Sequence, residues 1–111
     1  MPNDIFKPIL ETLKTKVTEL AIATFKEYKE AAKTDALSLL DQLKHNLENW
    51  TIQLASGELS KADFEFLVLA QKELIEMNAL KQAGLAMIKA DEFKAGLLDI
   101  ITSTVFSLIK I

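Results

Sequence analysis

Apolar residues recur every three or four positions through the first half of the chain. A first stripe runs from Phe6 to Ala31, by way of Leu10, Leu13, Val17, Leu20, Thr24 and Tyr28, and Lys and Glu residues occupy the opposite side. A second stripe is made of Leu40, Leu43, Leu47, Trp50 and Leu54. This spacing is the period of an α-helix that buries one face. The pattern therefore predicts amphipathic helices over residues 6–31 and 40–54.

Two signals bear on where these helices end. The stripe changes register over residues 31–36, where Thr34 or Asp35 could cap a new helix, but neither Gly nor Pro interrupts the segment. A break at 31–36 and a continuous helix of about 50 residues both fit this pattern, and the latter would be about 75 Å long. The clear break is at residues 56–60. Gly57 suits the left-handed position after a helix end, and Ser60, with Asp63 three residues later, is typical of a helix start.

The second half of the chain is more apolar than the first. Residues 64–70 are apolar around more than one face, as in helices that lie centrally in a bundle or at an oligomer interface. The main stripe of this segment continues through Leu74, Met77, Leu80, Gly84 and Met87 or Ile88. Asp91 interrupts the stripe, so a break or kink is expected over residues 90–92. Residues 93–111 are predicted to form a last helix, with a terminal strand as the alternative because β-branched residues lower helix propensity.

These elements predict one all-α domain over residues 1–111. Half of the residues are hydrophobic, and three Gly and two Pro are too few for a turn-rich β fold. The expected architecture is an antiparallel helical bundle built around a helical hairpin that turns at Gly57. Its segments form either four helices or two long arms that oligomerise to cover their apolar faces.

Charge and cysteine content narrow the functional classes. The formal net charge is −3, and all thirteen basic residues are Lys, which argues against a nucleic-acid-binding protein. The absence of cysteine excludes disulfides and thiolate metal sites. Neither a signal peptide nor an 18-residue apolar run is present, so a cytoplasmic protein is expected.

The residues that usually carry catalysis are scarce. His45 is the single histidine, and the helical period places it with Asp41 and Glu48 on the polar face, away from Leu43 and Leu47. Glycine-rich phosphate loops and Glu-x-x-His motifs are absent. We therefore predict no catalytic, cofactor-binding or metal-binding residue and no small-molecule substrate, and we expect the protein not to be an enzyme.

The wide apolar faces instead predict an interaction protein. A chain of this size has limited capacity to cover such faces, and exposed apolar patches usually mark interfaces. We expect a homo-oligomer, or the capture of another helical protein, through Phe64, Phe66, Leu67, Ile100, Ile101, Val105, Phe106, Leu108 and Ile109. The alternative is association with a lipid surface through residues 96–111. Residues 91–111 carry a net charge of −1, from two Lys against Asp91, Glu92 and Asp99, so anionic lipid would not attract this segment.

Overall fold

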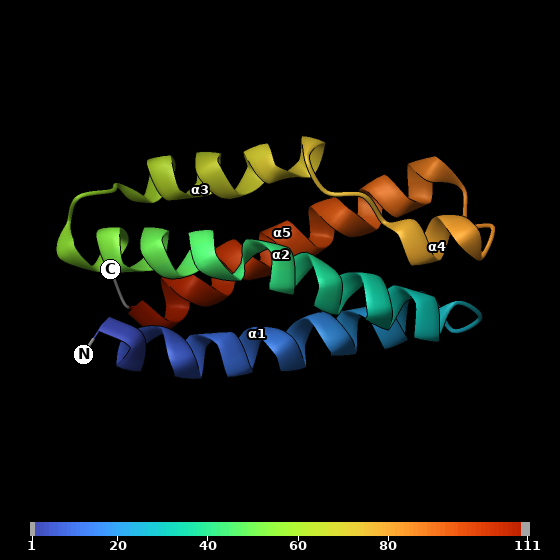
Figure 1. Ribbon diagram of the computed structural model, residues 1–111, viewed down its shortest axis with the longest axis horizontal. Helices are drawn as coiled ribbons and strands as arrows, with labels where there is room; N and C mark the ends of the chain where they lie inside the picture. Colours follow the sequence, from blue (N-terminus) through green and yellow to red (C-terminus); the bar gives the residue numbers. More distant parts are fainter. Residues whose placement is uncertain (1, 110–111) are drawn as a thin grey trace.

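The computed structural model describes residues 2–109, in which four long segments run up, down, up and down (Figure 1). The elements are α1 (Pro2–Thr24), α2 (Lys29–Ser56), α3 (Lys61–Ala70), the 3₁₀ helix η1 (Gln71–Glu73), α4 (Asn78–Gln82) and α5 (Met87–Ile109). Helix α1 packs on α2 and α5, while α3 packs on α5 and α2 from the opposite side. The prediction of an all-α antiparallel bundle is confirmed, in its four-segment form.

The first connection lies earlier than the sequence indicated. Helix α1 ends at Thr24, and α2 begins at Lys29 and continues without interruption through residues 31–36. Both the predicted break at 31–36 and the single helix of about 50 residues are therefore wrong. Neither Gly nor Pro marks the true connection. Its position is instead stabilised by packing, because the ring of Phe25 stands edge to face with Phe93 of α5 at a centroid distance of 5.1 Å.

The turn between α2 and α3 is the one that the sequence predicted. Gly57 has φ 86° and ψ 3°, the left-handed conformation that glycine adopts without steric cost. Its N–H donates to the carbonyl of Leu54, and the N–H of Glu58 donates to that of Gln53, which together form a Schellman motif. Ser60 then begins α3, with its hydroxyl accepting a hydrogen bond from the N–H of Asp63 at 3.0 Å.

The segment after α3 departs most from prediction. We expected one continuous stripe through Leu74, Met77, Leu80 and Gly84, but the helix stops after Glu73 and the chain crosses to α4, a helix of 5 residues. Gly84 has φ 97° and ends α4 with a second Schellman motif, in which Gly84 donates to Lys81 and Leu85 donates to Leu80. Residues 74–86, here called the α4 strap, therefore cross the end of the bundle instead of extending α3.

Two buried polar side chains hold the α4 strap in place. Asp35, on the buried side of α2, accepts hydrogen bonds from the N–H groups of Ala79 at 2.9 Å and Leu80 at 2.7 Å. A carboxylate from a distant helix thus caps the N-terminus of α4, whose own preceding residue supplies no side-chain cap. From α5, the buried Lys94 ammonium donates to the carbonyl of Ile75. Asp35 and Lys94 thus pair with backbone N–H and C=O groups that would have been bonded to each other along a continuous helix.

Helix α5 runs from Met87 to Ile109 and includes Asp91, so the predicted break at 90–92 is wrong. The break falls instead at Gly84. The buried side of α5 and the buried sides of the other helices form one hydrophobic core. The largest fully buried residues of this core are Phe64, Leu13, Leu39, Leu40, Leu43, Leu47, Leu80, Leu97, Leu98, Ile101, Val17 and Val68. Trp50 packs half-buried against this core, as the second stripe predicted.

Candidate functional site

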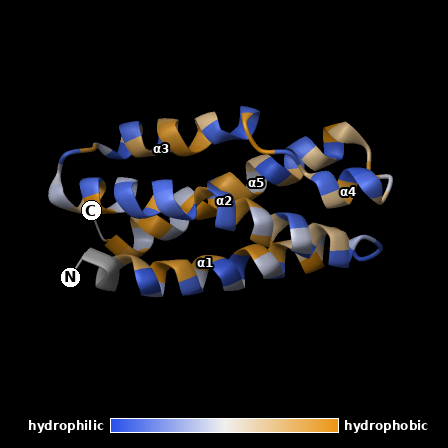
Figure 2. Cartoon of the chain, viewed as in Figure 1, coloured by the Kyte–Doolittle hydropathy of each residue, from blue (hydrophilic) through white to orange (hydrophobic). Residues whose placement is uncertain are grey.

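Helix α3 carries apolar residues on two opposite sides. Phe64 and Val68 point into the core and are fully buried. At about 100° per residue, Phe66 and Leu69 project from the other side of the helix, where 71% of Phe66 and 43% of Leu69 remain exposed. Figure 2 shows α3 as an outer helix in which hydrophobic and hydrophilic segments alternate along the whole length. We call Phe66 and Leu69 the outer apolar pair.

The inner side of α3 is anchored firmly enough to hold the outer pair in a fixed position. The ring of Phe64 lies 5.7 Å from that of Phe106 on α5, and the ammonium of Lys61 sits 5.5 Å from the centroid of the Phe106 ring. Aromatic and cation–π contacts of this kind each contribute about 0.5–1.5 kcal/mol. Together with the Ser60 cap, these contacts fix the rotation of α3 about its axis, which determines which side chains face outward.

The structure distributes the predicted interface residues over three environments. Phe64, Ile101 and Val105 are fully covered by the chain's own helices. Four others are half-buried: Leu67, Ile100, Phe106 and Ile109. Of these, Ile100, Phe106 and Ile109 pack against the core. Only Phe66 and Leu108, 71% and 45% exposed, are accessible as large apolar side chains, and they lie on different helices. The nine residues therefore do not form one surface.

The sequence pattern missed other exposed apolar side chains. Leu74, Met87 and Ile88 are each more than 70% exposed, although we had placed them on a buried stripe. The α4 strap explains this difference. Leu74 would continue the stripe only if the helix ran past Glu73, but the helix ends at that residue. Leu69 belongs to residues 64–70, which are apolar on more than one face. That pattern already indicated that part of this segment would be exposed.

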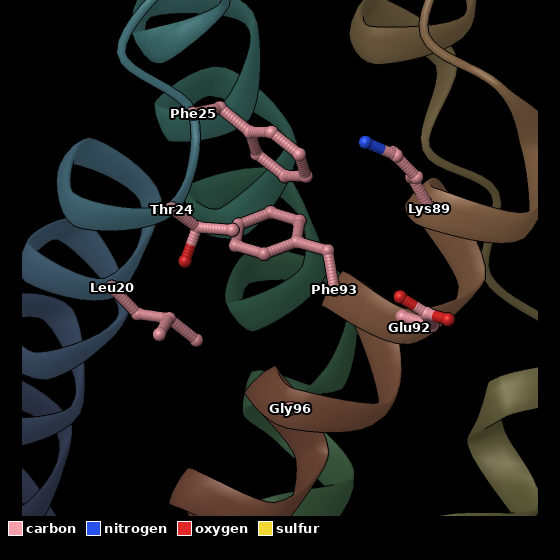
Figure 3. A pocket seen from close by; sticks show the side chains of 7 residues that line it. All are labelled: Leu20, Thr24, Phe25, Lys89, Glu92, Phe93 and Gly96. Carbon is pink, nitrogen blue, oxygen red and sulfur yellow. The ribbon is translucent and has the colours of Figure 1, made fainter.

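A groove with an aromatic wall separates the end of α1 from the start of α5 (Figure 3). Its volume is about 320 Å³, and it is lined by Leu20, Thr24, Phe25, Lys89, Glu92, Phe93 and Gly96. Figure 3 shows the rings of Phe25 and Phe93 packed against each other, with the ammonium of Lys89 and the carboxylate of Glu92 nearer the start of α5. The two charges are opposite, so the groove has no preference for an anion or a cation.

A second groove, of about 420 Å³, lies beside the α4 strap. Met77, Leu85 and Met87 give it an apolar lining, and Lys94 reaches it from α5. The ammonium of Lys94 is already bonded to Ile75 and lies 3.9 Å from the carboxylate of Asp91. The groove therefore combines a methionine-rich lining with an ammonium group, that of Lys94, which is already hydrogen-bonded within the chain.

The polar residues around His45 lie on the surface of α2. His45 is exposed on α2, as are Asp41 and Asn46 around it. Among the side chains that the structure describes, those of residues 6–109, no three carboxylate or imidazole groups form a metal-binding arrangement. Within the same residues, no helix is both long and apolar enough to span a bilayer. The outer apolar pair on α3 differs from the other exposed apolar residues in one respect: it lies on a helix whose opposite side, with Phe64 and Val68, is fully buried.

Fold and surface together define an all-α bundle in which α3 is uncovered on its outer side and the start of α5 exposes Met87 and Ile88. Comparison with known protein families, curated proteins and solved structures found no match to this chain.

Proposed function

We propose that this protein is a non-enzymatic, cytoplasmic interaction module that self-associates through the outer side of α3. A single observation carries the proposal: α3 is apolar on both sides, and the chain itself covers only the side with Phe64 and Val68. A helix that is apolar all round is normally buried on all sides. A second copy of α3 would supply the missing cover for Phe66 and Leu69.

The expected association is modest in strength. Helix α3 has 10 residues, which makes it about 15 Å long. A standard interface removes about 800 Å² from each partner, which is more than so short a helix offers by itself. Phe66 nevertheless provides the kind of rigid aromatic anchor that dominates binding energy at many interfaces. We therefore expect a dimer that dissociates on dilution through the micromolar range.

Sedimentation equilibrium across a dilution series tests the proposal. The unmodified chain should shift from dimer to monomer as it is diluted, and Phe66→Gln should remain monomeric, because the substitution removes the apolar anchor while keeping a good helix former. Ile22→Gln is the matched control, since Ile22 is an exposed apolar residue on α1, 46% accessible, on the other side of the bundle. A monomer at every concentration for the unmodified chain would sink the proposal.

Capture of a helix from another protein would use the same outer pair. Lipid association through residues 96–111 has less support, because Leu97, Leu98, Ile101 and Val105 of that segment face the core. Over residues 96–109, the described part of this segment, Leu108 is the one large apolar side chain that is exposed. Flotation with vesicles of neutral and anionic lipid at low salt checks this alternative, for which a bound fraction that falls in Leu108→Gln would be the supporting result.

A further inference from the structure

We propose that residues 71–86, which comprise η1 and the α4 strap, have a second conformation that joins α3 and α5 into one unbroken helix. In that conformation two copies of the chain exchange their α5 helices. The occupant of each vacated α5 position is thus a second copy, whose contacts there are those that the structure already shows within one chain. This inference goes beyond the proposed association through the outer side of α3 and does not depend on it.

The local sequence of residues 71–86 favours a helix. None of them is proline, and all except Ile75, Asn78 and Gly84 belong to the residue types that stabilise helices best. In the structure, however, α4 has 5 residues, and the rest of the segment is 3₁₀ helix or loop. Tertiary bonds from Asp35 and Lys94 hold this path. Local preference and tertiary contacts therefore oppose each other here, and such conflict favours competing conformations.

An unbroken helix would keep the buried sides of α3 and α5 on one face. At 100° per residue, five buried residues would fall within about 60° of one another: Phe64, Val68, Ile75, Phe93 and Leu97. A helix over residues 61–109 would be about 74 Å long, whereas the longest extent of the molecule is 43 Å. Its α5 half would therefore leave the α1 and α2 of its own chain and need other helices to cover its apolar side.

A second copy supplies those helices. Its own α5 is displaced in the same way, so each copy offers the vacated sides of α1, α2 and α3 to the α5 of the other. Such an exchange of identical elements restores the contacts of α5 with these three helices. The rings of Phe64 and Phe106, 5.7 Å apart within one chain, would then meet between copies. The two-fold axis would lie near the middle of residues 64–106, close to Gly84 and Leu85.

The exchange also accounts for two apolar side chains that the single chain leaves exposed. Long paired helices pack through the first and fourth positions of a seven-residue repeat, and Phe64 and Phe106 are six such repeats apart. The same repeat places Leu74, Leu85 and Ile88 on the seam between the two long helices. Leu74 and Ile88 are each 73% exposed in the single chain, and the helix of the second copy would cover them.

Asp35 selects between the two conformations. In an unbroken helix the N–H groups of Ala79 and Leu80 bond to the carbonyls of residues 75 and 76, so neither is free for the Asp35 carboxylate. The acid then lacks donors on the buried side of α2, which is strongly unfavourable. The seam of the long helices also carries polar residues: Gln71, Asn78, Lys81, Glu92 and Asp99. Both features make the strap the favoured conformation of the unmodified chain.

Removing the Asp35 cap and the break at Gly84 should convert the chain to the exchanged dimer. We expect the double variant Asp35→Ala with Gly84→Ala, refolded from urea at about 0.5 mM, to be mainly dimeric, because high concentration favours association. The dimer should persist for hours after dilution to about 1 µM, since its reversal requires α5 to unfold from the other copy. Its ellipticity at 222 nm should be about 10% more negative, because the residues of 71–86 outside α4 become α-helical.

Asn78→Pro in the same background is the control for the unbroken helix. Asn78 is the exposed first residue of α4, a position that accepts proline, whereas proline strongly destabilises the interior of a long helix. Adding Asn78→Pro should therefore restore a monomer at about 1 µM. Asn78→Ala, which is compatible with both conformations, should leave the dimer intact.

Cross-linking identifies the chain on which each α5 packs. The sequence has no cysteine, so Leu20→Cys and Gly96→Cys introduce one pair on α1 and α5. The two positions are close, because a Cβ added at Gly96 lies 3.7 Å from Leu20 Cδ2. After dilution, a short bismaleimide should join two chains of the exchanged dimer, which a denaturing gel shows as a covalent dimer. In a monomer, or in a dimer paired through α3, the link forms within one chain.

The outcomes separate the exchange from the association through α3. Cross-links within single chains at every refolding concentration would refute the exchange and leave the α3 association to its own dilution series. A dimer of the double variant that dissociates on dilution and is lost with Phe66→Gln is the α3 association, and it also refutes the exchange. If the double variant does not fold, Gly84→Ala alone carries the test, and its interchain cross-linking should exceed that of the unmodified background at least threefold.

Discussion

Replacing Asp35 should destabilise this protein far more than replacing any exposed acidic residue. The Asp35 carboxylate is buried and accepts two short hydrogen bonds, from Ala79 and Leu80. Hydrogen bonds to a charged group contribute about 1.5–3 kcal/mol each, and leaving a buried N–H unpaired costs about 1–3 kcal/mol. The desolvation that Asp35→Ala relieves offsets part of this sum. We expect a net loss of about 3 kcal/mol, out of about 5–15 kcal/mol for a domain of this size.

Urea denaturation followed by far-UV circular dichroism measures this loss directly. Asp41→Ala is the matched control, because Asp41 lies exposed on the same helix and should change the free energy of unfolding by less than about 0.5 kcal/mol. Asp35→Asn should be nearly as destabilising as Asp35→Ala, since its amide NH₂ would face one of the two donors. A loss below about 1 kcal/mol for Asp35→Ala would refute the reasoning and mean that the tertiary cap contributes little.

Two further substitutions test the packing and the backbone. Thr51→Val should stabilise the protein by about 1 kcal/mol. The Thr51 hydroxyl is fully buried and has no hydrogen-bond partner among the described residues. An unchanged or lower urea midpoint would contradict this prediction. Gly84→Ala should destabilise by about 1–2 kcal/mol, since φ 97° is strained for alanine. Gly96→Ala should stabilise by about 0.5–1 kcal/mol, because the added Cβ would meet Leu20 Cδ2 at 3.7 Å, an ordinary contact. Thermal melts of both glycine variants would refute this account if the two shifts had the same sign.

The sequence was sufficient for those parts of the fold that local interactions determine. The stripes in α1 and α2 follow from the helical period, and the turn at Gly57 and Ser60 follows from backbone preferences that act within a few residues. The α4 strap could not be found in this way. It is stabilised by Asp35 and Lys94, which lie 44 and 19 residues from their partners Ala79 and Ile75.

One signal for the strap was nevertheless present in the sequence. Asp35 stands three residues after Ala32 and four before Leu39, which places a carboxylate on the buried side of α2. A buried acid requires donors, so its position predicts a distant backbone partner, although not its identity. We had interpreted Asp35 as a helix cap for its own segment. The burial of Ile101 and Val105 could not be predicted for a similar reason, because it depends on which helices surround α5.

The shortness of α4 also determines how the native state can open. A helix of 5 residues has negligible stability in isolation, so the strap is ordered only while α2 and α5 hold it. Residues 74–86 are therefore expected to detach as a unit, which removes Ile75, Met77 and Leu80 from the core but leaves the contacts among α1, α2, α3 and α5. Such local openings are where proteases cut folded chains. Cleavage after the exposed Lys81 would leave α5 on a separate fragment. Because α5 packs against α1, α2 and α3, the two fragments should remain together as a noncovalent complex, so the fold should tolerate the loss of this covalent connection.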